Sequence, residues 1–112
     1  MQYLMLVRVG PDAHPTPEEA DPTAWVEESN LRGVRLRGDR LRPAGEATTV
    51  RVRDGQTVVT DGPYAELREQ IAGFDLLEVT DKAHAIRVAS AHPAARFGVL
   101  ELRAIWPFGA GE

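Results

Sequence analysis

The pattern of apolar and polar residues predicts a series of β-strands. Residues 3–9 are apolar almost throughout, which is typical of a central strand covered on both faces. Other segments alternate between apolar and polar residues, the period of a half-buried strand. Two of these, 48–53 and 56–60, are joined by Asp54-Gly55, a dipeptide that favours a tight β-hairpin. Further strands are predicted at residues 34–37, 74–79 and 98–106.

Two other segments carry helix signals. Asp21-Pro22 places a capping carboxylate before a proline at the first helical position, and Gly33 suits the end of that helix. The Pro-rich segment 10–22 before it is predicted as a loop. A second helix is predicted within residues 81–92, ended by Pro93. The predicted inward-facing residues of this helix are Ala85, Ile86 and Ala89. On the last strand, one side is predicted to carry Leu100, Leu102, Ala104 and Trp106.

The predicted order of elements is β-α-β-(β-hairpin)-β-α-β, which indicates the α+β class. We expect a ferredoxin-like βαββαβ arrangement with an extra hairpin, a mostly antiparallel sheet and two helices on one face. Because two helices cover only one face of such a sheet, we expect a second copy to cover the other. The sequence therefore predicts a homodimer joined through the sheet faces.

Size and composition fit a single domain spanning residues 1–112. Of these residues, 43% are hydrophobic and 27% are charged, which is typical of a soluble globular protein. The longest apolar run is far shorter than the roughly 20 residues of a membrane span, and residues 1–10 lack the features of a signal peptide. We therefore expect a cytoplasmic protein without membrane contact. The formal net charge of −4 gives no basic footprint, so direct nucleic-acid binding is not expected.

The chain offers little for metal or cofactor chemistry. It has no cysteine, which removes disulfides, thiolate nucleophiles and thiolate zinc ligands. His84 and His92 are eight positions apart, too far to share a helix face closely, and His14 lies in the predicted loop. Nucleotide-binding glycine motifs and serine-hydrolase motifs are absent from the sequence. No metal and no cofactor is expected.

A long central stretch resembles a known family. Residues 50–79, VRVRDGQTVVTDGPYAELREQIAGFDLLEV, are similar to the signature of the DGPF-type branch of the YCII-related proteins. Tyr64 stands where that signature has phenylalanine and Arg68 where it has lysine. The resemblance covers most of the chain and continues through AHPAAR at 91–96. The positions that match the signature are Asp61, Gly62, Pro63, Glu66, Glu69 and Gly73.

The resemblance implies a dimeric α+β barrel with ferredoxin-like subunits. In relatives, a histidine–aspartate pair has been suggested as an active site, and some DGPF-type proteins are linked to sigma-factor-type transcription genes. The resemblance implies no particular substrate, because fold likeness alone does not carry function.

Asp61 is the first candidate for chemistry. It opens a Gly62-Pro63 turn, where a carboxylate commonly hydrogen-bonds the backbone two residues on. The alternative is a rigidly held base at the rim of a pocket, with Gly62, Pro63 and Tyr64 as ligand contacts. Tyr64 is otherwise a core or pocket-wall residue.

Four further residues are candidates for chemistry, and each has a structural alternative. His92 is a proton-transfer candidate, or else a residue whose imidazolium form caps the preceding helix. Asp39 completes a pocket with Asp61, or else pairs with Arg40 or Arg42. Glu66 and Glu69 flank a ligand groove if their segment is helical, or else are solvated acids.

Two functions therefore stay open. In one, the protein binds or transforms an unknown small molecule by Asp/His proton transfer, as an isomerase or lyase does, in a pocket rimmed by the DGPY segment. In the other, it is a non-enzymatic dimeric interaction module linked to transcription. The first requires Asp61 to converge on a pocket with His92, Asp39 or Glu66.

Overall fold

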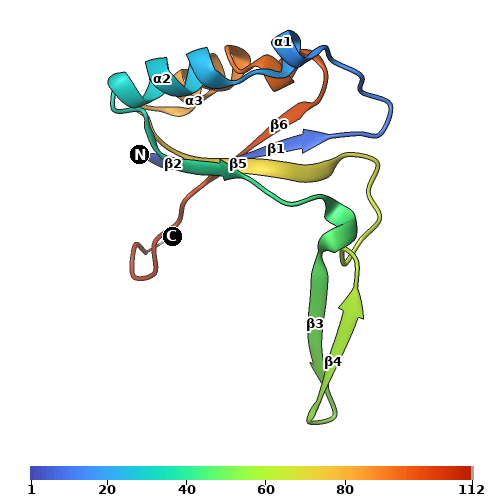
Figure 1. The fold of residues 1–112 in the computed structure, drawn as a ribbon. Helices are drawn as coiled ribbons and strands as arrows, with labels where there is room; N and C mark the ends of the chain where they lie inside the picture. The colour runs from blue at the N-terminus through green and yellow to red at the C-terminus, as the bar shows by residue number, and fades with distance from the viewer. Residues whose placement is uncertain (112) are drawn as a thin grey trace.

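The computed structural model describes residues 1–111 and has one helical layer on one main sheet (Figure 1). The sheet has the strand order β2-β5-β1-β6, and each neighbouring pair is antiparallel. Its strands are β1 (Gln2–Val9), β2 (Arg35–Arg40), β5 (Gln70–Glu78) and β6 (Val99–Ala104). The predicted α+β class and antiparallel sheet are confirmed.

Two helices make the long crossovers between the strands of this sheet. Helix α2 (Thr23–Leu31) connects β1 to β2, and helix α3 (Lys82–Ser90) connects β5 to β6. The first crossover passes over β5 and the second passes over β1. The two βαβ units therefore interlock, as in a ferredoxin-like fold. Both helices lie on the same face of the sheet (Figure 1). This is the arrangement predicted from the order of elements.

The helices begin and end close to the predicted signals. The Asp81 carboxylate accepts a hydrogen bond from the His84 N–H at the start of α3, and Gly33 follows α2 with a φ of 71°. The predicted loop over residues 10–22 contains a short helix, α1 (Pro17–Ala20), that the prediction missed. The 3₁₀ turns η1 (Ala44–Glu46) and η2 (Pro93–Arg96) complete the helical elements.

The core lies between the helices and one face of the sheet. Met5 and Leu77 are fully buried there, and the indole of Trp25 covers them from α2. One predicted inward residue is wrong: Ile86 is 49% exposed, because the small Ala85 and Ala89 face the sheet instead. The last strand ends before Trp106, which is 68% exposed.

The predicted hairpin exists but stands apart from the main sheet. Strands β3 (Thr48–Arg53) and β4 (Gln56–Asp61) form their own two-stranded sheet, joined by Asp54 and Gly55 with φ of 52° and 75°. Two successive positive φ values are the geometry of a type I′ turn. The hairpin projects away from the body on the side opposite the helices (Figure 1). We call residues 48–61 the arm.

Among residues 1–111, every helix is too short and too polar to cross a lipid bilayer.

Candidate functional site

A cavity of about 290 Å³ lies between the helical layer and the sheet. Its exposed lining residues, which include Asp39 and Arg40, place its mouth beside the edge strand β2. The cavity mixes apolar walls with a small set of polar groups, as ligand sites usually do. The lining residues are Val7, Pro22, Val26, Arg35, Gly38, Asp39, Arg40, Ala72, Gly73, Phe74, Asp75 and His92.

Asp75 is the buried carboxylate of this cavity. It lies in the middle of β5 with its side chain on the helix side of the sheet, and it is only 6% exposed. Its Oδ1 accepts a hydrogen bond from Arg35 Nε at 2.7 Å, and Arg35 Nη2 also donates to the Gly38 carbonyl at 2.7 Å. The second oxygen, Oδ2, has no hydrogen-bond partner among the described residues. Every fully buried side-chain oxygen or nitrogen there does have a partner, so Oδ2 is not fully buried. Oδ2 is therefore accessible, and Asp75 lines the cavity.

Burial raises the pKa of the Asp75 carboxyl, and the charge of Asp39 adds to that rise, while Arg35 opposes it. A carboxylate that is desolvated in this way binds a proton more readily than an ordinary aspartate. The nearby guanidinium still favours the ionised form. Asp75 is thus suited to accept a proton from a bound molecule and to hold it.

Glycine at position 38 is what allows this ion pair to form. A Cβ built at Gly38 would overlap the Asp75 Oδ1 atom and would lie 2.6 Å from the backbone oxygen of Phe74. Arg35 also donates to the Gly38 carbonyl, so the glycine both admits the carboxylate and anchors its partner. Strand β2 therefore contributes the cation and the space that the Asp75 carboxylate needs.

His92 is the second buried polar group of the cavity. Its Nδ1 accepts a hydrogen bond from the Ala94 N–H at 3.0 Å, so the ring caps the start of η2. The edge of the ring meets Trp25, with ring centroids 4.7 Å apart. Burial lowers the pKa of His92 to about 4. The ring is therefore neutral at pH 7, and because Nδ1 is an acceptor, its hydrogen is on Nε2.

This geometry corrects the interpretation of His92 as a cationic helix cap. The residue does follow the end of α3, where a positive charge is favoured. It is only 7% exposed, however, and the cost of burying a charge outweighs the helix dipole. Nε2 makes no hydrogen bond within residues 1–111, where every fully buried side-chain nitrogen has a partner. This N–H is therefore accessible, and His92 lines the cavity.

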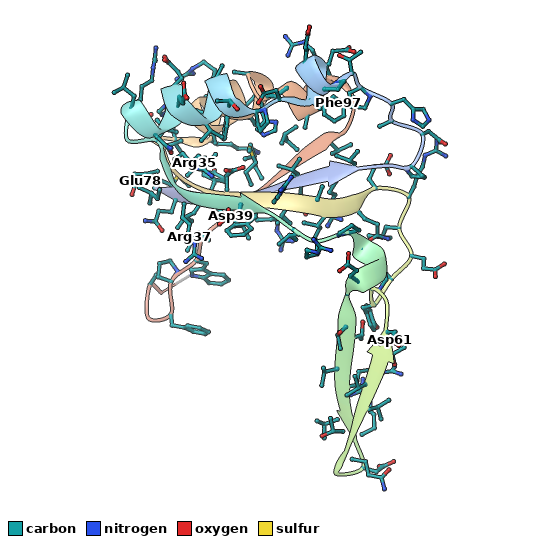
Figure 2. The ribbon with its side chains drawn as sticks, in the orientation of Figure 1. Arg35, Arg37, Asp39, Asp61, Glu78 and Phe97 are labelled. Carbon is teal, nitrogen blue, oxygen red and sulfur yellow. The ribbon has the colours of Figure 1, made fainter. Side chains whose placement is uncertain are left out.

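The structure brings together two of the predicted site residues and separates a third. His92 and Asp39 both line the cavity, and Asp39 forms no ion pair with Arg40 or Arg42. Asp61 instead lies at the end of the arm strand β4, well away from Asp39 in Figure 2. Within one chain, the expectation that Asp61 converges on a pocket with His92 or Asp39 is therefore wrong.

The DGPY segment forms the base of the arm rather than a cavity rim. Gly62 has a φ of 99°, and its N–H donates to the Ala47 carbonyl at 2.7 Å. The Asp61 carboxylate accepts no hydrogen bond from a backbone or side-chain donor within residues 1–111, so the expected bond to the backbone of the turn is not formed. Tyr64 is 81% exposed, so it is not a core residue, and with Pro63 it lines only a small open hollow of about 110 Å³ on the arm.

The two predicted glutamates also lie outside the cavity. Glu66 and Glu69 belong to an irregular segment rather than a helix, so they share no helix face. Among the described residues, no group of three or more histidine, aspartate and glutamate side chains is arranged to hold a metal ion.

Asp75 was not predicted as a site residue. The signal in the sequence is an acidic residue in the middle of an apolar strand, FDLLEV. Such a residue is costly to bury unless it is paired, which makes it a candidate for function.

Comparison with known proteins agrees with the resemblance seen in the sequence. Residues 1–109 match the model of the YCII-related domain. An uncharacterised protein of Rhizobium meliloti (strain 1021) is 36% identical over 77 residues, which cover 65% of this chain. The match spans 60% of the length of that relative.

Proposed function

The chain belongs to the YCII-related family, and from that premise we propose that its cavity binds a small polar organic molecule and moves a proton on it. One observation carries this proposal. A neutral histidine with a free N–H and a buried aspartate with a free oxygen both line the same cavity. A donor and a proton acceptor facing one apolar space are the minimum that proton transfer at a carbonyl compound requires.

The protonation states of His92 and Asp75 give the two residues different roles. His92, neutral with its hydrogen on Nε2, would donate a hydrogen bond to the carbonyl oxygen of the ligand. Asp75 would take the proton from the adjacent carbon, leaving an enolate whose oxygen His92 stabilises. Return of the proton from Asp75 to another carbon gives an isomerase, and loss of a leaving group from the enolate gives a lyase.

The test is solvent deuterium exchange on small carbonyl compounds. Compounds are first screened for shifts of the Gly38 and Gly73 amide resonances, which report binding in the cavity, and the binders are then incubated with the protein in D₂O. We expect deuterium to enter next to the carbonyl, and Asp75→Asn to slow this at least 100-fold while binding persists.

Two variants sharpen this test. His92→Gln keeps an acceptor for the Ala94 N–H and should also slow the exchange, whereas Asp61→Asn, outside the cavity, should leave it unchanged. Binding in the cavity without exchange, or exchange that Asp75→Asn does not slow, contradicts the proposal.

We also propose that the chain belongs to the DGPF-type branch of the family. The Asp61–Tyr64 segment and the residues after it support a place in the DGPF-type branch. A non-enzymatic dimeric interaction module stays the second candidate because the exposed arm favours it. Failure of every carbonyl compound to bind the cavity would favour that candidate.

A further inference from the structure

Arg40 lies on the same face of the main sheet as the Asp75 carboxylate. Residues that lie opposite each other in antiparallel strands share a face, and so do residues two positions apart in one strand. Asp75 lies opposite Gly38, and Gly73 lies opposite Arg40. Since the Asp75 side chain is on the helix side, strand β2 places Arg40 on that side too, where it lines the cavity.

The sheet leaves open space between Arg40 and the far wall of the cavity. Gly73 stands between Arg40 on one side and Val7 on the other, and it has no side chain. A Cβ at position 73 would lie 3.0 Å from the backbone oxygen of Asp39, so a larger residue would crowd strand β2 as well. The Arg40 side chain therefore borders open space at the mouth of the cavity.

Arg40 is exposed and makes no hydrogen bond or ion pair within residues 1–111. The other arginines of this part of the chain are paired. Arg35 donates to Asp75 at 2.7 Å, and Arg42 donates to Glu46 at 3.0 Å. The guanidinium group of Arg40 therefore keeps all its donors for a bound molecule.

The nearest acid in the chain does not neutralise Arg40. Asp39 lies opposite Phe74, on the face away from the helices, and Figure 2 shows it below the sheet, with Arg35 above. On the helix side, two guanidinium groups share the cavity with a single carboxylate, and His92 is neutral. The charge on this side of the cavity is therefore positive, which favours an anionic ligand.

We propose that the molecule taken up by this cavity carries a carboxylate group, which Arg40 binds at the mouth, while Asp75 and His92 act on a carbonyl group further in. A guanidinium group binds a carboxylate through two parallel N–H···O hydrogen bonds, which fix the orientation of the ligand. The substrate class is then that of small oxo acids. This inference deepens the proposed function and rests on it, because it assigns the same cavity as the binding site.

The spacing of the two side chains fits a molecule of a few carbons. Arg40 is one strand across from Asp75 and two residues further along. With strands ~4.8 Å apart and ~3.4 Å per residue, their Cα atoms are about 8 Å apart. Both side chains extend into this span, so a short chain can connect a carboxylate at Arg40 with a carbonyl group near Asp75. The cavity volume of about 290 Å³ suits a ligand of that size.

The test compares small oxo acids with their neutral amides. The probes are pyruvate, acetoacetate and levulinate, each beside its own amide, which keeps the carbonyl group and the size but removes the charge. Binding is titrated at neutral pH through the backbone amide resonances of Gly38 and Gly73. We expect at least one oxo acid to bind about 10-fold more tightly than its amide, as a charge-assisted hydrogen bond allows.

Arg40→Gln and Arg37→Gln form the matched pair of variants. Both replace an exposed arginine of β2 that has no ion pair within residues 1–111. Arg37, however, lies opposite Leu76 on the face away from the helices, below the sheet in Figure 2. Arg40→Gln should abolish the preference for the acid over the amide, whereas Arg37→Gln should preserve it.

Three results overturn the inference: equal affinity of every acid and its amide, a preference that survives Arg40→Gln, or a preference that both variants lose equally. Failure of all three acids to bind in the cavity overturns it as well. The fate of proton transfer is read separately. Deuterium exchange on the amides without any preference for the acids contradicts the inference alone, and acids that bind through Arg40 without exchange contradict proton transfer alone.

Discussion

The cavity and the arm are held together in opposite ways. In the cavity, groups from the edge strand β2, the central strand β5 and the start of η2 meet, and no buried polar side-chain atom within residues 1–111 lacks a partner. In the arm, two strands that are adjacent in sequence pair over six residues each and are joined by a tight turn. Almost every residue of the arm is exposed. The cavity is therefore complete within one chain, while the arm is complete only as a local structure.

This difference indicates where chemistry and where association can take place in the molecule. A site for chemistry needs groups fixed by several elements and removed from water, which only the cavity offers. A site for association needs an accessible apolar surface, which the arm and the open sheet face offer. Substitutions in the cavity should therefore affect the stability of the chain, and substitutions in the arm should affect its assembly.

The largest effect is expected for Gly38→Val. The added side chain would displace the Asp75 carboxylate from Arg35 and press on the Phe74 carbonyl. Loss of a buried ion pair together with a backbone clash should lower the free energy of unfolding by about 3 kcal/mol or more. Urea denaturation, followed by circular dichroism, measures this change in the free energy of unfolding.

Gly45→Ala is the matched control for that substitution. A Cβ at Gly45 meets nothing within 4 Å and its φ is not positive, so the free energy of unfolding should hardly change. Equal effects of the two substitutions would show that Gly38 is not needed for the Arg35–Asp75 contact.

The next largest effect is the dependence of stability on pH. The pKa of His92 is about 4 in the folded chain and about 6.5 when unfolded. On acidification the unfolded chain therefore binds the proton first, and stability falls between pH 6.5 and pH 4, by roughly 3 kcal/mol at pH 4. The raised pKa of Asp75 acts in the opposite direction.

His92→Gln separates these two contributions, since it removes the histidine and leaves Asp75 in place. The difference in free energy of unfolding between wild type and this variant should shrink by about 3 kcal/mol from pH 7 to pH 4. A difference that does not change with pH would mean that His92 titrates as an exposed histidine does.

The smallest effect is expected for Asp61→Asn. The Asp61 carboxylate is exposed and accepts no side-chain hydrogen bond from residues 1–111. The melting temperature should therefore change by no more than the equivalent of about 0.5 kcal/mol. A loss of several degrees in differential scanning calorimetry would show that Asp61 holds the turn after all.

Much of the fold could be predicted from local patterns. Asp54-Gly55 between two alternating segments specified the hairpin, because both residues accept the positive φ of a type I′ turn. The position of the hairpin outside the main sheet could not be predicted. Strand propensity and turn chemistry are satisfied equally well in the sheet and in a projecting arm, and only tertiary packing decides between them.

The site was predictable only in part. His92 was identified as a proton-transfer candidate, but its neutral state depends on burial against Trp25, which is distant in sequence. Asp75 was missed because both faces of its strand are apolar: Phe74 and Leu76 lie on one and Leu77 on the other. The alternation therefore did not show which face was inward, and the partner Arg35 is 40 positions away.

The most direct test of the account is the protonation state of the His92 ring, followed by ¹⁵N NMR of the imidazole nitrogens from pH 3 to pH 8. The account predicts a neutral ring with its hydrogen on Nε2 at pH 7 and a midpoint near pH 4. A midpoint near 6.5, or the hydrogen on Nδ1, would contradict it, because the cavity would then lack the N–H donor that the proposed chemistry at a carbonyl oxygen requires.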